Sequence, residues 1–445
     1  NIQKNLSRLE EAEENYRKAI EAKPDYAEAH TNLGNTLKDL GKLEDSELSQ
    51  KKAIELRPNF IEGHYNLGVL LQKRNKTSEA ELSYKKAIEL NPSYVDAHNN
   101  LGIMQGQLGK LNEAVTSFKK SIELRPDYAE AHANLGNTLK DLGKLEEAAE
   151  SQRKALEHKM DFDVGHYNLG TTLYLLKQFK KAADEFELSN YKDSKKHLLK
   201  CYFDLNDQSN LIKQLDKMLD QGYNNAVIGS FVSRSKARYG VHKQNPFCNE
   251  PLNYILKTDL TKLCDFKNIF IETTKNILND NKIINRAQTL LINGTQTSGN
   301  LFSQNNNLVE KMKDIIDLEI KKYLEKYKDS DEGFLKNWPK SYYLNGWLIS
   351  MKNGGKLTPH IHDFGWLSGS IYINVPPKKT VDSGNLVVCI DDKEDEKDPN
   401  KNPKKSIDVT TGSFCLFPAS LLHYTIPFEA DEERIVLAFD VIPND

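Results

Sequence analysis

The chain has 445 residues, enough for two or three domains, and its 61 Lys and Arg residues against 64 Asp and Glu residues give a net charge of -3. So balanced a charge excludes a strong field toward nucleic acid or an anionic membrane, and we expect neither as a partner. No run reaches the roughly 18 apolar residues of a membrane span, and the five scattered cysteines have no zinc or disulfide spacing, so we expect a cytoplasmic protein.

The first half of the chain is periodic. The dipeptide Leu-Gly recurs every 34 residues, at Leu33-Gly34, Leu67-Gly68, Leu101-Gly102, Leu135-Gly136 and Leu169-Gly170. This period resembles that of tetratricopeptide (TPR) repeats over about residues 8–189. Because one helical hairpin cannot bury its apolar side alone, we expect the hairpins to stack into an all-α solenoid with a concave groove.

The repeat count predicts a lone helix near residues 8–22, five complete hairpins, and a degenerate closing pair near 192–220. We therefore expect a solenoid over 1–189, capping helices and a linker over 190–240, and a separate domain over 241–445. The stretch from Gly229 through Pro251 is interpreted as the junction. Since the chain opens inside a repeat, we expect sequence before Asn1 in the full-length protein.

Two polar residue types keep the repeat period. The histidines are expected to pack rather than bind metal, because neighbours about 10 Å apart cannot share an ion. The asparagines before each Leu-Gly either contact a peptide in the groove or are simply solvated. The repeats resemble those of O-linked N-acetylglucosamine transferase, which implies a protein or peptide partner in the groove. The residues are His30, His64, His98, His132 and His166, and Asn32, Asn66, Asn100, Asn134 and Asn168.

The second half changes from helices to short strands. Leu260–Leu278 and Leu308–Tyr327 have helical patterns, and the polar run from Asp391 through Lys405 is interpreted as a solvated loop. Short segments rich in β-branched and aromatic residues follow the helices, which predicts an α+β domain with a small sandwich or barrel. The predicted strands are Tyr342–Met351, Gly369–Val375, Asn385–Ile390, Ser413–Phe417 and Arg434–Val441.

Three histidines of this second half are candidate metal ligands: His360, His362 and His423. Residues i and i+2 of a strand share a face, so the first two can approach one ion, which His423 would join from a distant strand. Imidazole suits iron, zinc and copper, and three protein ligands with open positions are typical of non-haem Fe(II) oxygenases.

The order of motifs resembles a known family. H-x-H is followed by Ser-Gly-x-x-Tyr, by Gly-x-x-x-x-Phe-Pro-x-x-x-x-His, and by Glu-Arg-x-x-x-x-Phe-Asp, over about residues 336–443. This series is similar to 2-oxoglutarate/Fe(II) oxygenases related to prolyl hydroxylases. The resemblance implies a double-stranded β-helix (jelly-roll) core, with Fe(II), 2-oxoglutarate and O2 as cofactor and cosubstrates.

The resemblance also implies a binding site for 2-oxoglutarate. Arg434 matches the basic residue that binds the far carboxylate in such enzymes, and a guanidinium fork can engage a carboxylate through two hydrogen bonds. Tyr372 matches a tyrosine that shares this carboxylate, and Ser368 and Ser370 lie on the same strand face. The plain alternative is that Arg434 is a surface partner of Glu432 or Glu433.

One departure from the family pattern concerns charge. Prolyl hydroxylases have an acid two residues after the first histidine, where this chain has His362. Three neutral imidazoles leave an Fe(II) site at +2 rather than +1. Three ligand sets therefore stay open: His360, His362 and His423; Asp363 in place of His362; or two histidines completed by water. Trp347 and Trp366 flank the region, as core residues or as walls of a substrate pocket.

The function implied is an Fe(II)- and 2-oxoglutarate-dependent dioxygenase that hydroxylates a protein side chain (Pro, Asp or Asn) recruited by the TPR groove. The alternative is a non-catalytic TPR scaffold with a degenerate cupin-like ligand-binding domain. A glycosyltransferase is the weakest interpretation, because the second half lacks a doubly wound α/β pattern.

Overall fold

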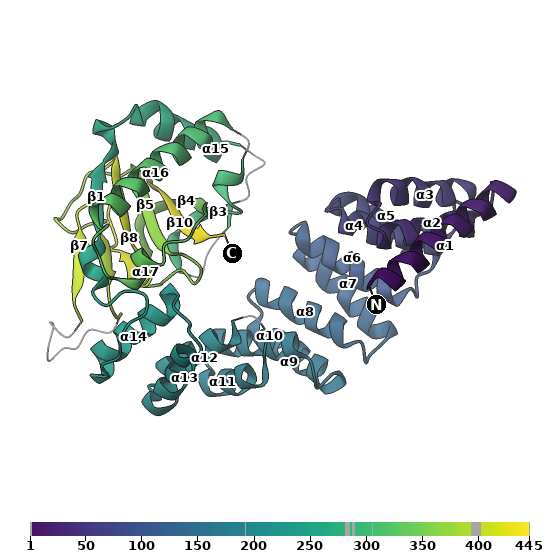
Figure 1. Ribbon diagram of the computed structural model, residues 1–445, viewed down its shortest axis with the longest axis horizontal. Coiled ribbons are helices and arrows are strands. Elements are labelled where there is room, and N and C mark those ends of the chain that lie inside the picture. The colour runs from purple at the N-terminus through teal and green to yellow at the C-terminus, as the bar shows by residue number, and fades with distance from the viewer. Residues whose placement is uncertain are drawn as a thin grey trace. The chain divides into compact units, whose positions relative to one another are not determined.

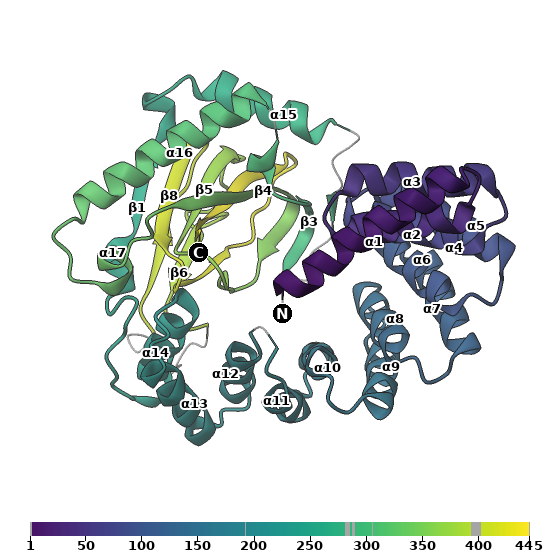
Figure 2. The ribbon, with the colours of Figure 1, turned by 45° about the vertical axis from the view of Figure 1, so that its right-hand side comes forward.

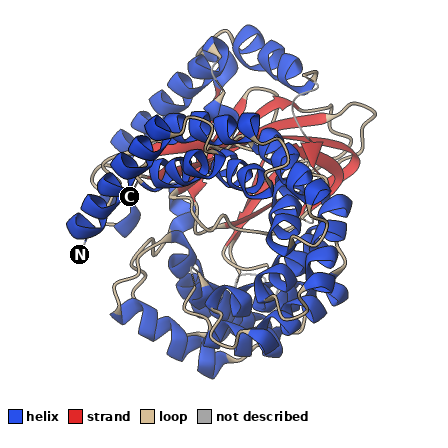
Figure 3. Ribbon diagram, turned by 90° about the vertical axis from the view of Figure 1, so that its right-hand side faces the viewer, coloured by secondary structure: helices blue, strands red, loops and turns tan. Residues whose placement is uncertain are grey.

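The computed structural model describes residues 2–191, 193–280, 285–286, 290–304, 306–392 and 402–444. The chain divides into two compact units, Asn1–Asn206 and Asp207–Asp445. In Figure 3 the strands, in red, lie together, and the other regular elements are helices, in blue. No helix among the described residues is long and apolar enough to cross a membrane.

The first unit is a series of antiparallel helical hairpins, as the 34-residue period predicts (Figure 1). A single long helix is followed by five hairpins and by the first helix of the closing pair. The helices are α1 (Ile2–Ala22), α2 (Ala27–Asp39), α3 (Leu43–Leu56), α4 (Ile61–Lys73), α5 (Thr77–Leu90), α6 (Val95–Gln107), α7 (Leu111–Leu124), α8 (Ala129–Asp141), α9 (Leu145–His158), α10 (Asp163–Leu175), α11 (Phe179–Leu188) and α12 (Ser194–Asp204).

The repeat signature has a steric cause. The glycine of each Leu-Gly lies where the two helices of a hairpin approach most closely: a Cβ on Gly102 would stand 2.7 Å from the ring of Phe118 in the partner helix. The repeat histidines bind backbone, since Nε2 of His98 donates to the carbonyl of Pro92 at 2.9 Å. The other four make the equivalent bond at 2.9 to 3.2 Å, so their packing role is confirmed.

The second unit begins with two helices, α13 (Gln208–Asp220) and α14 (Ala226–Tyr239). The interpretation of Gly229 onward as a junction was wrong for α14, whose apolar side is buried. Gly229 interrupts the sequence pattern because a Cβ there would lie 2.6 Å from Phe247. The helix begins with Asn225 accepting from the amide of Ile228 and ends at Gly240 in the left-handed conformation.

Two arginines of α14 anchor the polar insertion. Arg234 and Arg238 both bind the carboxylate of Asp391, at 3.2 Å and 2.7 Å, and both reach Asp392 at 3.3 Å. Asp391 is buried, which corrects the prediction that the insertion is solvated from its first residue. Residues 393–401 of the insertion lie outside the described residues.

The rest of this unit has three layers. A seven-stranded sheet, in the order β1-β8-β5-β10-β4-β3-β2, has one face covered by helices such as α16 (Asn307–Lys326), which Figure 2 shows lying across it. Its other face packs on a three-stranded sheet, β7-β6-β9. The strands are β1 (Leu256–Asp259), β2 (Asn285–Arg286), β3 (Leu291–Thr297), β4 (Tyr342–Leu357), β5 (Leu367–Asn374), β6 (Leu386–Cys389), β7 (Lys404–Ile407), β8 (Ser413–Pro418), β9 (Leu422–Thr425) and β10 (Arg434–Pro443).

From β4 onward the chain winds between the two sheets. It visits the large sheet with β4, β5, β8 and β10 and the small sheet with β6, β7 and β9. Adjacent strands in both sheets are antiparallel. This alternation is the winding expected of a double-stranded β-helix.

The helices of this domain partly follow the sequence patterns. The helix predicted at Leu308–Tyr327 is α16 (Asn307–Lys326), whereas Leu260–Leu278 is broken. That segment contains the 3-10 turn η2 (Leu260–Lys262), the π-helical turn η3 (Lys267–Glu272) and the short helix α15 (Thr273–Leu278). The other short elements of the domain are the 3-10 turns η1 (Pro251–Tyr254) and η4 (Leu301–Ser303) and the helix α17 (Gly333–Lys336). The five strands predicted from sequence are β4, β5, β6, β8 and β10, each of which differs from the prediction at one end or both.

We expect Gly102→Ala to destabilise the repeat unit by about 1–3 kcal/mol, because the added methyl meets Phe118 in a closely packed interface. The matched control is Gly106→Ala in the same helix, where nothing lies within 4 Å. There, alanine should be neutral or stabilising by up to about 1 kcal/mol. Denaturant unfolding measures both variants, and equal stabilities would contradict the steric reading.

Candidate metal centre

The first and third candidate histidines are paired through their backbones. The chain leaves β4 at Leu357, and the amide of His360 then donates to the carbonyl of His423 at 3.2 Å. The amide of His423 donates back to the carbonyl of His360 at 3.0 Å. This antiparallel bridge extends the small sheet, because His423 already pairs with Val388 of β6. The two side chains are therefore neighbours although their segments are far apart in sequence.

The three imidazoles converge. Ring centroids lie 4.3 Å apart for His360 and His423, 4.8 Å for His362 and His423, and 5.1 Å for His360 and His362. One nitrogen from each ring lies within 4.8 Å of the other two, as a shared metal ion requires. Among the described residues this is the one such group, and Asp363 is not a member of it.

The second nitrogens of the rings differ in their surroundings. Nδ1 of His360 donates to the carbonyl of Thr358 at 2.8 Å, and Nδ1 of His362 lies 2.6 Å from Oδ1 of Asp440. Nε2 of these two rings is therefore the atom available to a metal. Nδ1 of His423 is buried and has no hydrogen-bond partner among the described residues, and an orphaned polar atom of this kind fits a site that would bind a ligand.

Burial sets the protonation of two rings. It lowers the pKa of His360 to about 4 and the pKa of His423 well below its ordinary value, and the neighbouring imidazoles add to both shifts. Both are then neutral, the form that binds metal. Burial also opposes charge on His362, but the carboxylate of Asp440 outweighs it and raises the pKa of that ring.

The two tryptophans have different roles. Trp347 meets the ring of His362 edge-on at 5.3 Å and so forms a wall of the centre. Trp366 packs against the core below the large sheet, and its indole donates to the carbonyl of Phe334 at 2.6 Å. Of the two roles considered for Trp366, core residue or wall of a substrate pocket, the structure supports the first.

Arg434 is buried on β10 without an acidic partner among the described residues. It is 1% exposed, Nη1 donates to the carbonyl of Gly384, and its Nε and Nη2 have no acceptor in this part of the chain. The guanidinium lies 5.1 Å from the ring centroid of Tyr372. Glu433 instead accepts from Ser350 at 2.6 Å, so the surface ion pair considered as the alternative is absent among these residues.

The predicted cosubstrate residues on β5 separate into two places. Ser370 donates to the hydroxyl of Tyr372 at 3.3 Å, beside Arg434. Ser368 donates instead to Asp440 at 2.9 Å, beside His362. The sequence motifs include Asp440 as their last residue, but sequence reasoning gave it no role in the site. It lies on β10 an even number of residues after Arg434, so strand alternation already placed both on one face.

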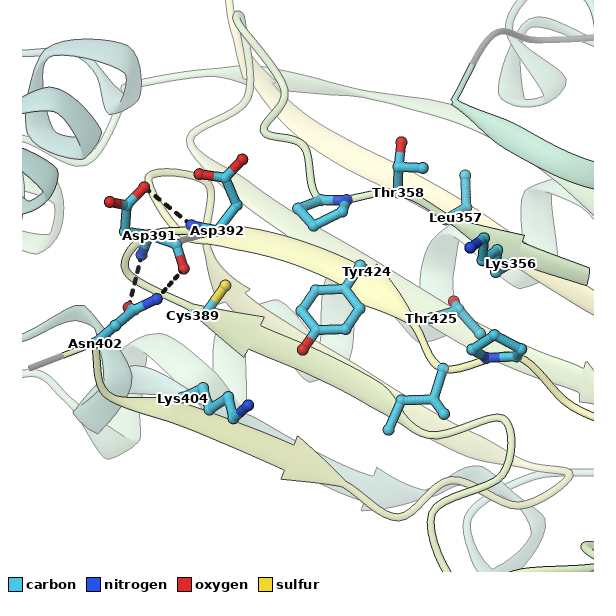
Figure 4. A pocket seen from close by; sticks show the side chains of 13 residues that line it. Lys356, Leu357, Thr358, Cys389, Asp391, Asp392, Asn402, Lys404, Tyr424 and Thr425 are labelled. Carbon is cyan, nitrogen blue, oxygen red and sulfur yellow. Dashed lines mark hydrogen bonds between the residues drawn. The ribbon is translucent and has the colours of Figure 1, made fainter. Parts of the chain in front are cut away.

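A groove of about 450 Å³ lies near the histidines but does not contain them (Figure 4). Pro359 and Tyr424, each next to a triad histidine in sequence, line it. Since successive residues of a strand face opposite ways, Tyr424 faces away from the side of β9 that carries His423. At one end Asp391 and Asn402 are joined, the amide of Asp391 donating to Oδ1 of Asn402 at 2.9 Å.

Comparison with known proteins divides the chain in the same way. Residues 345–440 match a family described as "Putative 2OG-Fe(II) oxygenase". Models of tetratricopeptide repeats match residues 4–41, 27–60, 61–94, 83–116, 105–143 and 129–158. The chain therefore joins TPR repeats to a region of that oxygenase type. No curated protein matches.

Solved structures that are similar to part of this chain include those of three proteins. A crystal structure of YrrB, "a TPR protein with an unusual peptide-binding site", is 22% identical over 44% of this chain and 96% of that one, with a TM-score of 0.36. MamA is 28% identical over 36% and 92%, with a TM-score of 0.34. PilF of Pseudomonas aeruginosa is 18% identical over 47% and 97%, with a TM-score of 0.41.

The ligand set can be tested with Mn(II) and Co(II) alone. We expect His362→Ala to weaken metal binding by more than the roughly 10- to 100-fold typical of losing an outer partner, because it removes one of the three converging nitrogens. Asp363→Asn should leave the affinity within about twofold of wild type. Anaerobic titration of metal-free protein measures both, and the opposite ranking would make Asp363 the ligand.

Proposed function

We propose that the second unit is an Fe(II)- and 2-oxoglutarate-dependent dioxygenase, in which His360, His362 and His423 hold the metal. The observation that carries this proposal is a triad of converging imidazoles, one buried and two partly buried, in the same domain as a buried guanidinium with two nitrogens that have no acceptor among the described residues. Neither feature stabilises the fold by itself. A buried donor without an acceptor costs about 1–3 kcal/mol, so a ligand that completes both is the economical explanation.

A dicarboxylic acid fits the second feature. Nε and Nη2 of Arg434 are the donors left for a carboxylate, and the hydroxyls of Tyr372 and Ser370 lie on the same side. The far carboxylate of 2-oxoglutarate would neutralise the guanidinium, whose charge has no acidic partner among the described residues. Its 2-oxo acid end is then free to reach the metal.

The reaction proposed is the one that the resemblance to 2-oxoglutarate/Fe(II) oxygenases implies. Bound Fe(II) supplies the redox chemistry by which 2-oxoglutarate, O2 and a C–H bond give succinate, CO2 and an alcohol, one oxygen atom entering each organic product. The residues of this chain orient the reactants and exclude water. Trp347 against His362 and Phe417 at 5.1 Å from His423 supply apolar walls for this purpose.

The substrate is proposed to be a protein side chain, of Pro, Asp or Asn. TPR repeats form concave surfaces that bind extended peptides. This chain carries several such repeats, which precede the oxygenase-type region in the sequence. The periodic asparagines, among them Asn100 and Asn134, are the proposed peptide contacts. This part of the proposal depends on the repeats and is separate from the metal chemistry.

Turnover of 2-oxoglutarate tests the proposal directly. Protein reconstituted with Fe(II) under reducing conditions should convert 2-oxoglutarate to succinate, and metal-free protein should not. Succinate is measured by mass spectrometry, with Zn(II)-loaded protein as a control that fills the site without redox activity. Absence of iron-dependent succinate would favour the non-catalytic scaffold.

Arg434→Ala should abolish 2-oxoglutarate turnover and leave Mn(II) affinity largely intact, because the guanidinium contacts none of the three histidines. The lost interaction is worth about 1.5–3 kcal/mol, on the order of 10- to 100-fold in affinity for 2-oxoglutarate. Arg434→Lys should rescue little, since it lacks the planar fork. Unchanged turnover in Arg434→Ala would remove this residue from the site.

Gly384→Ala is a milder variant at the same place. Gly384 has a φ of +71°, and a Cβ there would contact Nη1 of Arg434. We expect a raised KM for 2-oxoglutarate without loss of metal affinity, because the displaced guanidinium keeps its charge. A loss of metal affinity with an unchanged KM would contradict this assignment.

A further inference from the structure

Asp440 lies at the junction of three segments that form the metal centre. It stands on β10, where its Cα partners are Asn345 of β4 and Ser368 of β5. The residue is 5% exposed. Its Oδ1 accepts from the hydroxyl of Ser368 at 2.9 Å and lies 2.6 Å from Nδ1 of His362. A buried carboxylate is thus joined directly to one ring of the triad.

The three rings are held in three different ways. A neutral carbonyl holds Nδ1 of His360, and Nδ1 of His423 has no partner among the described residues. Within the described chain, His362 is the triad ring whose Nδ1 bonds a carboxylate. Hydrogen bonds to an ionised acceptor are shorter and roughly twice as strong as neutral ones. His362 is therefore the most firmly oriented of the three ligands.

Charge gives this bond a second role. The sequence has His362 where related enzymes have an acid, so three imidazoles alone would leave Fe(II) at +2. The carboxylate of Asp440, which is one hydrogen bond away from the metal ligand His362, adds one negative charge to the centre. The whole group of metal, three rings and Asp440 then carries +1, the charge of a site with two histidines and one carboxylate.

The backbone is built closely around this carboxylate. A Cβ on Gly365 would lie 3.1 Å from Oδ1 of Asp440, tighter than an ordinary contact. The next amide, of Trp366, donates to the carbonyl of Val441 at 2.8 Å and so holds the segment after His362 against β10. Glycine at 365 permits this approach, which brings His362 within reach of Asp440.

We infer that Asp440 is the positioning residue of the metal centre: it keeps the proton of His362 on Nδ1, directs Nε2 toward the other two rings, and supplies through that ring the charge of the missing ligand carboxylate. The inference rests on the metal site of the proposed function. It assigns no direct contact between Asp440 and metal or substrate.

The test compares Asp440→Asn with Ser368→Ala. The amide keeps the shape of the side chain and removes its charge, so Mn(II) and Co(II) affinity should fall on the order of 10- to 100-fold. Ser368→Ala removes a hydrogen bond to the same oxygen, and a hydroxyl 3.3 Å from Nδ1 of His362, but keeps the charge, so its loss of metal affinity should be clearly smaller. The absorption spectrum of bound Co(II) should change in Asp440→Asn, because the donor strength of His362 changes.

A second measurement examines the tautomer of His362 in the wild-type protein and does not require Asp440→Asn to fold. Nitrogen NMR of ¹⁵N-histidine-labelled, metal-free wild-type protein at alkaline pH should show His362 protonated on Nδ1, with the signal assigned from its absence in His362→Ala. A proton on Nε2 would overturn the inference. So would an Asp440→Asn variant that folds normally and binds Mn(II) as tightly as wild type.

These outcomes differ from failure of the proposed function. Wild-type protein that binds Mn(II) through the triad but makes no succinate would sink the dioxygenase and leave the role of Asp440 standing. Normal succinate production by the wild-type protein, together with unaltered metal affinity in Asp440→Asn, would support the dioxygenase and overturn the role of Asp440.

Discussion

Two backbone hydrogen bonds between His360 and His423 determine where the candidate metal centre lies. They fasten the segment after β4 to the short strand β9, and β9 is in turn fixed to β6 through the pair Val388 and His423. With the backbones paired, the two imidazoles become neighbours, and His362 follows two residues later. The large sheet contributes Asp440 and Arg434 from a single strand face, so the centre forms where both sheets contribute side chains.

The repeats could be predicted almost completely from sequence, because every hairpin makes the same kinds of contact at the same positions, and the glycine and histidine of those contacts recur every 34 residues. Gly102 against Phe118 and His98 against Pro92 are such contacts. The second unit offers no such repetition. Strand β9 has only four residues, too few for a recognisable pattern. The helix α14 was not predicted because Gly229 interrupts its helical pattern, and the reason for that glycine, the close approach of Phe247, is visible only in the structure.

The candidate site was predictable to the extent that its chemistry needs uncommon residue types. Three histidines and one arginine in a fixed order are rare enough to be noticed, and the structure brings the histidines together. Aspartates are common, and the place of Asp440 depends on the register of β10 against β5. The same register places the hydroxyl of Ser368 beside that carboxylate. Strand alternation alone shows only which face Ser368 shares, and not whether it lies beside Asp440 or beside Arg434.

The ion pairs of α14 have a practical consequence for dissecting the molecule. Asp391 is buried, and the guanidinium groups of Arg234 and Arg238 neutralise it. A fragment that starts after this helix would keep the acid and lose both counterions, and an uncompensated buried charge costs about 3–5 kcal/mol. A fragment of the second unit should therefore begin ahead of α13, so that α14 and its two arginines stay with the sheets.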